Sequence, residues 1–365
     1  TRYWRDWSSD VCSSDLPDFK QTEPSRGSVF SLNVSGPGAL EQWSDELCFA
    51  PVASRVASGD TDLIAPPRLA QLNRRRDAAG WWQVIGHGGL IVVSAGIWLQ
   101  PSWPWSLRLP ALLLLGWGLA FGFCAMHECG HRTAFASRRL NDAVAWWAGV
   151  LSFYNADFYR RYHQWHHRYT HQPGLDPELE DRPPANLAAY LLELSGLSWW
   201  LGKIRGHWKG MTGDFSGCPY ISPEAAPEVR DSIRRQLLVY ALLLLVSLPA
   251  ANGLIVWGWL LPLLLGQPLL RFVLMAEHGG CATTDDGLQN TRTTLTLPPL
   301  RWLMWNMPFH VEHHVYPSLP FHALAAAHRE IAPRLVHLTP GYLTVHRRFL
   351  ADLDALALPA AAALR

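Results

Sequence analysis

Long apolar stretches constrain this chain more than any other feature, because each needs either a bilayer or a large buried core. Four of them cover residues 81–99, 109–126, 236–249 and 254–270. A helix that spans a membrane needs about 20 mainly apolar residues, with a lower limit near 17. The first, second and fourth stretches meet this limit. The stretch 236–249 approaches it when its flanking residues are included. The short connections between successive stretches predict two hairpins, and therefore an integral membrane protein with four transmembrane helices.

The positive charges indicate the orientation of these helices. Arginines lie on the same side of every predicted span, at positions 74–76, 132, 138–139, 234–235 and 271. Positive residues favour the cytosolic side of a membrane, so both termini and the long middle segment are expected in the cytosol. The expected membrane is a bacterial inner membrane. Two shorter apolar stretches, 144–153 and 187–201, are too short to cross and predict interfacial or packed helices.

The composition agrees with a membrane protein. Hydrophobic residues make up 49% of the 365 residues and charged residues only 17%, against about 25% charged in an average soluble domain. The chain contains 19 tryptophans, a residue type that gathers at membrane–water interfaces. The net charge of +1 argues against a nucleic-acid partner, because such proteins are usually basic.

The domain boundaries follow from these stretches. Residues 6–16 can be written, codon by codon, as a common short-read library adapter, so we expect residues 1–16 to be a sequencing artefact. Residues 17–80 mix Pro, Gly, Ser and charges and predict a loosely structured cytosolic segment. The membrane domain is expected at 81–345, followed by a C-terminal tail at 346–365.

Histidines occur in three clustered boxes beside the predicted spans. The boxes read HECGH at 127–131, HQWHH at 163–167 and HVEHH at 310–314, and a lone His278 follows the fourth span. Residues three or four positions apart share one helix face, so each box presents its histidines together. Imidazole suits iron, copper, nickel and zinc, and three such faces predict a His-rich site for two metal ions. The overall fold class is then all-α, with a cytosolic helical cap that holds this dimetal site.

Two other interpretations of these histidines come from different functional classes. The first box also fits HExxH, in which two histidines bind zinc and Glu128 acts as the general base of a membrane metalloprotease. That interpretation leaves both HxxHH boxes without a role. A metal transporter would place ionisable residues within the spans, whereas these histidines gather at the membrane edge.

Together the boxes and their flanks resemble the membrane fatty acid desaturase superfamily. The resemblance covers about residues 80–340. Its flanking motifs are His131-Arg132-Thr133, Asp176-Pro177-Glu178, Trp305-Asn306-Met307-Pro308 and Tyr316-Pro317.

By this resemblance, nine histidines are the expected metal ligands: His127, His131, His163, His166, His167, His278, His310, His313 and His314. Some family members place an asparagine four residues before the histidine that His278 resembles, and Leu274 stands at that position here. Carboxylates beside the boxes are candidates to orient the imidazoles, namely Glu128, Asp157, Asp176, Glu277 and Glu312. Candidates to line a substrate path beside the third box are Trp305, Asn306 and Phe309.

The resemblance also implies the chemistry. Two iron ions, dioxygen and two external electrons would remove hydrogen from an unactivated methylene of a lipid, most often a fatty acyl chain. Loss of a second hydrogen gives a double bond, and oxygen rebound gives an alcohol, so a lipid, carotenoid or hydrocarbon hydroxylase is the alternative within the superfamily. No haem or flavin motif is visible, so a separate ferredoxin or cytochrome is the expected electron donor.

Overall fold

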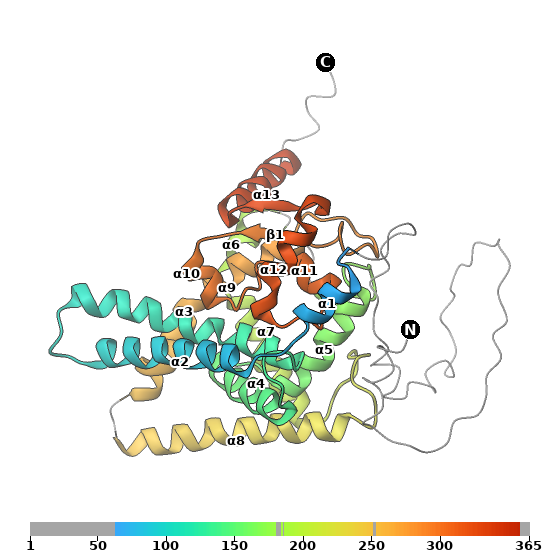
Figure 1. Cartoon of the computed structure of the whole chain (residues 1–365). Coiled ribbons are helices and arrows are strands. Elements are labelled where there is room, and N and C mark those ends of the chain that lie inside the picture. Colours follow the sequence, from blue (N-terminus) through green and yellow to red (C-terminus); the bar gives the residue numbers. More distant parts are fainter. Residues whose placement is uncertain (1–62, 180–183, 185, 251–252, 358–365) are drawn as a thin grey trace. The chain divides into compact units, whose positions relative to one another are not determined.

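The computed structural model describes residues 63–179, 184, 186–250 and 253–357. The predicted adapter segment, most of the N-terminal segment and the end of the C-terminal tail lie outside these residues. The elements, coloured along the chain in Figure 1, are α1 (Pro66–Leu72), α2 (Asp77–Leu99), α3 (Trp105–Gly130), α4 (Arg138–Ser152), α5 (Ala156–Tyr169), η2 (Pro177–Leu179), α6 (Leu187–Ser195), α7 (Leu197–Thr212), α8 (Ala226–Ala250), η3 (Val256–Leu260), α9 (Leu261–His278), β1 (Thr293–Leu295), α10 (Pro298–Leu303), α11 (His310–Val315), α12 (Phe321–Ile331), η4 (Ala332–Arg334), β2 (Leu338–Pro340) and α13 (Tyr342–Ala357).

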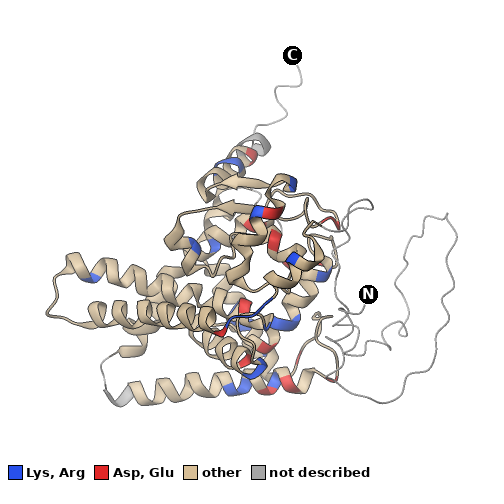
Figure 2. Ribbon diagram, viewed as in Figure 1, with Lys and Arg blue, Asp and Glu red and all other residues tan. Residues whose placement is uncertain are grey.

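Three helices of the described chain are long and apolar enough to cross a membrane. They are Asp77–Leu99, Trp105–Gly130 and Val256–His278, which contain the first and second predicted stretches and all but the first two residues of the fourth. The third stretch, 236–249, forms the C-terminal half of α8, and its crossing of the membrane remains a prediction. Figure 2 shows few charged residues along α2 and α3, whereas blue and red residues gather on the N-terminal half of α8.

α3 is the central helix, and α2, α4 and α9 pack around it. In its most apolar window 72% of the residues are buried, compared with 22% in α2. Large apolar side chains of α2, such as Trp82 and Val92, are 78% and 71% exposed, as expected for a helix that faces lipid. α3 and α9 approach closely because both carry glycine at their contact: a Cβ on Gly116 would collide with the Pro262 carbonyl, and a Cβ on Gly266 would collide with Gly116. Small residues permit this kind of backbone contact between membrane helices.

Polar caps and left-handed residues set the ends of the shorter helices. Asn155 caps α5, and its Oδ1 accepts a hydrogen bond from the Phe158 backbone N–H at 3.0 Å. Phe153, just before it, adopts a φ of 65° and reverses the chain after α4. α6 and α7 are separated by Gly196, whose φ of 74° glycine adopts without the steric cost that a Cβ brings. The stretch predicted at 187–201 is therefore two helices, α6 and the start of α7, rather than one.

The structure adds two details to the sequence-based expectation. The segment before the first span is not loosely structured throughout, because α1 packs against α12 and buries Leu72 in a small second core with Leu324 and Ile331. The fold also contains one short parallel pairing, β1 with β2, in register from Thr293 opposite Leu338. Strands of three residues are too short to give a recognisable alternation of polar and apolar residues.

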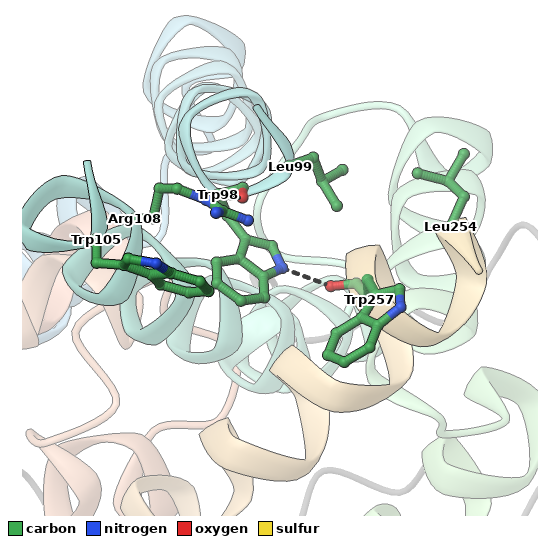
Figure 3. Close-up of a pocket in the computed structure, with 6 residues that line it drawn as sticks. All are labelled: Trp98, Leu99, Trp105, Arg108, Leu254 and Trp257. Atoms are coloured by element: carbon green, nitrogen blue, oxygen red, sulfur yellow. Dashed lines mark hydrogen bonds between the residues drawn. The ribbon is translucent and has the colours of Figure 1, made fainter. Parts of the chain in front are cut away.

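One pocket of about 450 Å³ lies at the ends of the helices opposite to those that carry the histidines. Figure 3 shows Trp98, Trp105, Arg108 and Trp257 around it, with the Trp98 indole N–H donating to the Trp257 carbonyl at 2.8 Å. The Arg108 guanidinium lies over both Trp105 and Trp98. At a rise of 1.5 Å per residue, Arg108 and His127 are about 28 Å apart along α3. The pocket is thus separate from the histidine cluster and resembles an interfacial aromatic belt.

Candidate metal centre

Four segments that are distant in sequence bring the predicted histidines together. His127 lies in the last turn of α3 and His131 at its C-cap. α5 carries the second box, α11 carries the third, and His278 is the last residue of α9. All nine predicted histidines are part of one cluster.

The first group of the cluster contains five histidines from three boxes: His127, His131, His163, His167 and His313. One nitrogen from each lies within 4.8 Å of the corresponding nitrogen of all the others. His167 Nε2 lies 2.9 Å from His163 Nε2 and 3.0 Å from His313 Nε2. Two imidazole nitrogens bound to one ion at about 2.0–2.1 Å lie about 3 Å apart when they subtend a right angle. These separations therefore fit donors that converge on a common metal ion.

The second group contains His166, His278 and His314, whose ligand nitrogens also lie within 4.8 Å of one another. His310 joins them, because its Nε2 lies 3.1 Å from both His278 Nε2 and His314 Nε2. The two groups are adjacent, since the His167 and His314 rings stack with centroids 4.2 Å apart. The cluster could therefore hold two ions side by side.

Hydrogen bonds fix the tautomer of the second group. Asp176 Oδ1 lies 2.9 Å from His166 Nδ1, and the Asn290 carbonyl lies 3.0 Å from His278 Nδ1. Both partners can only accept, so each Nδ1 carries the proton. Thr170 donates its hydroxyl proton to the His166 carbonyl at 2.8 Å and must therefore accept from His314 Nδ1 at 3.2 Å. In their neutral forms all three imidazoles would therefore present the Nε2 lone pair that a metal requires.

Burial keeps most of these imidazoles neutral. It lowers the pKa of His163, His167, His310, His313 and His314 well below the ordinary value, and neighbouring histidines lower it further. Burial and the Arg160 charge lower the pKa of His131 to about 3. Both nitrogens of His127 are buried without a hydrogen-bond partner, an arrangement that a bound metal ion would explain.

His166 differs because carboxylates surround it. Burial alone would lower its pKa, but Glu178 and Asp176 together raise the pKa of His166 to about 9. Glu178 Oε2 lies 3.6 Å from His166 Nε2. From the sequence this glutamate was noted only as part of a flanking motif, and no role was predicted for it. Such a carboxylate beside the ligand nitrogen could share the metal or balance its charge.

The predicted orienting carboxylates fall into two sets. Asp176 contacts His166, and Glu277 Oε2 lies 3.5 Å from His310 Nε2. Glu312 is fully buried between the histidines of α11 and accepts hydrogen bonds from Thr293 Oγ1 and His328 Nδ1, both at 2.5 Å. It therefore anchors the third box to β1 and α12 rather than orienting an imidazole of the cluster directly.

Glu128 and Asp157 do not reach the cluster among the described contacts. Glu128 accepts hydrogen bonds from the Thr133 hydroxyl and, at 3.1 Å, from the Phe321 backbone N–H. It ties the end of α3 to the start of α12, which is not the position of a general base beside a metal. Asp157 lies in the first turn of α5, where the positive end of the helix dipole stabilises a carboxylate.

Several positioning groups were not predicted from the sequence. Tyr159 contacts His163 Nδ1 through its hydroxyl at 3.3 Å, in addition to Thr170, Asn290 and His328 described above. Tyr159 lies four residues before His163 on α5, so helical spacing could have found it. Thr170, Asn290 and His328 meet their histidine or carboxylate partners only through the tertiary fold.

The three proposed substrate-path residues form part of a tight turn between α10 and α11. Trp305 and Asn306 adopt φ values of 51° and 61°. Trp305 Nε1 donates to His87 Nδ1 at 3.1 Å, and Asn306 Nδ2 donates to the Phe321 carbonyl at 3.0 Å. The Phe309 ring contacts His328 with centroids 4.9 Å apart. These contacts position α11, and a role toward substrate remains a prediction.

Comparison with known proteins places this cluster in context. The family model described as fatty acid desaturase matches residues 103–346. This range contains all three boxes and His278, together with α3 and α9.

Curated relatives of modest identity carry the same kind of name. The "sn-1 oleoyl-lipid 12-desaturase" of Anabaena variabilis is 25% identical over 276 residues, which are 73% of this chain and 66% of that relative. The protein of the same name from a Synechocystis strain is 25% identical over 67% of this chain and 71% of its own length. The "sphingolipid delta(4)-desaturase/C4-monooxygenase" of Rattus norvegicus is 27% identical over 66% of this chain and 70% of its own length.

Proposed function

The chain belongs to the fatty acid desaturase family, and from this premise we propose that it is an integral membrane oxidoreductase that introduces a double bond into a lipid acyl chain. The observation that carries this proposal is the cluster of nine convergent histidines, three of which present Nε2 through fixed tautomers. The names of the relatives support a lipid substrate. The zinc protease interpretation loses its support, because the Glu128 carboxylate accepts from Thr133 and Phe321 instead of facing the cluster.

The reaction balances with one dioxygen molecule and an external donor. Two hydrogen atoms, which amount to two protons and two electrons, leave adjacent methylenes of the substrate. Two further protons and two electrons come from outside, and dioxygen is reduced to two waters. We propose that His127, His131, His163, His167 and His313 hold one iron ion and that His166, His278, His310 and His314 hold the other. Bound iron would supply the dioxygen activation that no side chain can perform.

The protein's own residues would hold this site rigid and dry. Asp176, Asn290 and Thr170 fix the imidazoles of the second group through the hydrogen bonds described above. Leu274 offers no ligand atom, but Glu277 would contribute an oxygen near His310. The Glu277 Oε1 atom is buried without a hydrogen-bond partner and is therefore free to do so. A methylene can lose hydrogen to such a site only if the rest of the chain is held in position, which the apolar surroundings of α3 and α9 would achieve.

We further propose that the four helices cross the membrane as two hairpins, with the histidines and both termini on the cytosolic side. The arginine distribution supports this orientation, and an electron donor of the ferredoxin or cytochrome type would then reach the site from the cytosol. A cysteine-labelling map of the loops 100–104 and 213–225 in whole cells tests it. The first loop should label from outside and the second only after lysis.

Lipid profiling by mass spectrometry of a host that expresses the full chain tests the activity. New double bonds are expected with the native sequence, and they should vanish with His313→Ala. They should persist with His337→Ala, a histidine outside the cluster. New hydroxyl groups with the same dependence would instead establish the hydroxylase alternative, which the monooxygenase name of the rat relative supports. Lipids unchanged in the presence of added reductant and a supplied donor would contradict both.

A further inference from the structure

Two cationic side chains share one aromatic cluster between α7 and α9. The Arg271 Nη2 donates to the Tyr154 hydroxyl at 2.9 Å, and its guanidinium lies 5.6 Å from the Trp199 ring centroid. Lys203 Nζ lies 3.9 Å from the Tyr154 ring centroid and 5.8 Å from that of Trp199. We call Tyr154, Trp199, Lys203 and Arg271 the basic clamp.

The basic clamp has more donors than acceptors. Tyr154 already accepts from Arg271 and, at 2.9 Å, from Trp199 Nε1, so its own proton is left to donate. Arg271 Nε is buried and has no hydrogen-bond partner. Among the described residues, neither Lys203 nor Arg271 forms a salt bridge with a carboxylate. Both cations are half-buried, and withdrawing a cation from water without an anionic partner is costly, so an anion from outside the chain would lower this cost.

The electrostatic state of Lys203 is consistent with this excess of positive charge. Burial and the nearby Arg271 charge lower the pKa of Lys203 to about 7, and Glu178 raises it only in part. The groups that face Lys203 are Arg271 on α9, Glu178 on η2, Tyr154 before α5, and His207 one turn along α7. The Arg271 charge thus has a larger effect on Lys203 than the Glu178 charge, and the Glu277 carboxylate acts on Arg271 from farther along α9.

A second unsatisfied polar group lies beside the basic clamp. Gln267 is one turn before Arg271 on α9 and is fully buried, and neither its amide oxygen nor its amide nitrogen has a partner. A Cβ on Gly196 would lie 2.9 Å from the Gln267 Cβ, so the start of α7 lies directly against this residue. Residues at i and i+4 share a helix face, so Gln267 and Arg271 form one polar stripe on an otherwise apolar helix.

The basic clamp lies close to the histidine cluster. Tyr154 contacts Phe123 with centroids 4.8 Å apart, and Phe123 contacts His127 at 6.1 Å. Arg271 is seven residues before His278 on α9, which is about 10 Å of helix. A group held by the basic clamp would therefore sit within an acyl chain's length of the proposed metals.

We propose that the basic clamp binds the oxyanion of the lipid substrate, a phosphate or a carboxylate, and that Gln267 binds a neighbouring polar group of the same lipid. This inference rests on the proposed function and assigns the basic clamp a role in substrate recognition. Anchoring the charged end would fix which methylene of the acyl chain reaches the histidine cluster. Arg271 and Tyr154 would position the substrate and take no part in the chemistry.

Binding to the purified full-length protein tests this proposal without requiring turnover. The probes are phosphatidylglycerol, oleate and an uncharged diacylglycerol, with binding followed by native mass spectrometry in detergent. Lys203→Gln and Arg271→Gln should each weaken binding of the anionic probe by about tenfold or more, because charge-assisted hydrogen bonds are lost. Arg205→Gln is the matched control, since Arg205 is on α7 but exposed, and it should bind normally.

Each outcome decides the proposal. Preference for phosphatidylglycerol identifies a phosphate and preference for oleate a carboxylate, and both support the basic clamp. Equal binding of diacylglycerol, or equal loss in Arg205→Gln, would overturn it. If Arg271→Gln does not fold, Arg271→Lys and Lys203→Gln carry the test. Double bonds formed in cells without any anion preference would refute the basic clamp alone, whereas anion binding without any oxidised lipid would refute the proposed function alone.

Discussion

Replacing Asp176 by asparagine should selectively weaken the second metal group. Asp176 is 1% exposed and accepts three N–H bonds, from His166 Nδ1 at 2.9 Å, Glu178 N at 3.0 Å and His171 N at 2.6 Å. An asparagine has only one acceptor oxygen. If the asparagine oxygen accepts from His166 and Glu178, the asparagine NH₂ group faces the His171 N–H and one hydrogen bond is lost. In the reverse orientation the hydrogen bond to His166 is lost.

The magnitude follows from these contacts. Leaving one buried donor unsatisfied costs about 1–3 kcal/mol, and removal of a partner that orients a ligand histidine lowers metal affinity about 10–100-fold. The variant should therefore unfold at lower temperature and bind its second ion at least tenfold more weakly. The first group, which does not contact Asp176, should keep its affinity.

Anaerobic equilibrium dialysis with Fe²⁺, followed by elemental analysis, measures this effect. The native protein should saturate at two ions, whereas Asp176→Asn should show one tight and one weak ion. Asp157→Asn is the matched control, because Asp157 is on the same helix as His166 without contacting the cluster, and it should behave as the native protein does. Two ions of unchanged affinity in Asp176→Asn would refute the argument that this carboxylate fixes His166.

Three further outcomes are expected. Glu312→Gln should destabilise the fold by about 1–3 kcal/mol. In a thermal-unfolding double-mutant cycle, Glu312→Gln combined with His328→Ala should cost less than the sum of the two single changes. Additive losses would show that the two side chains act separately. Gly266→Ala should lower the unfolding temperature, because its Cβ would meet Gly116 and overpacking costs about 1–3 kcal/mol, whereas Gly96→Ala, which meets nothing within 4 Å, should be neutral or slightly stabilising. Anion binding should be strongest below pH 7 and weaken as the pH rises through about 7, where Lys203 loses its proton. Lys203→Arg should abolish this pH dependence. A flat binding profile of the native protein from pH 6 to pH 9 would contradict the stated role of Lys203.

The sequence predicted the parts of this fold that depend on local spacing. The stretches 81–99 and 109–126 lie within α2 and α3, because long apolar runs have few alternatives in water or lipid. The fourth predicted span lies in α9, which continues to His278, eight residues past the predicted end at Leu270, because Arg271 interrupts the apolar run without ending the helix. Hydropathy alone therefore ends a helix where its polar, functional part begins.

What the sequence could not predict are contacts between distant segments. Asp176 follows the second box closely and was a reasonable candidate, whereas Thr170 meets His314 across 144 residues and Asn290 meets His278 only because the loop after α9 folds back. Glu128, adjacent to His127, looked like an orienting group but ties α3 to α12. Adjacency in sequence does not determine on which side of a helix end a carboxylate points.

The arrangement of buried donors joins the proposed metal centre and the basic clamp in one argument. Around the histidines, every tautomer that a hydrogen bond fixes leaves an acceptor nitrogen toward the centre of the cluster, which is what a cation requires. Around Arg271, Lys203 and Tyr154 the unpaired groups are donors, which is what an anion requires. α9 carries both kinds of site, with His278 at its end and Arg271 two turns earlier. A single rigid helix would thus set the distance between the charged end of a lipid and the metal that oxidises its chain, so a shift of register between α9 and α3 at Gly116 and Gly266 should change the position of the double bond rather than only its yield.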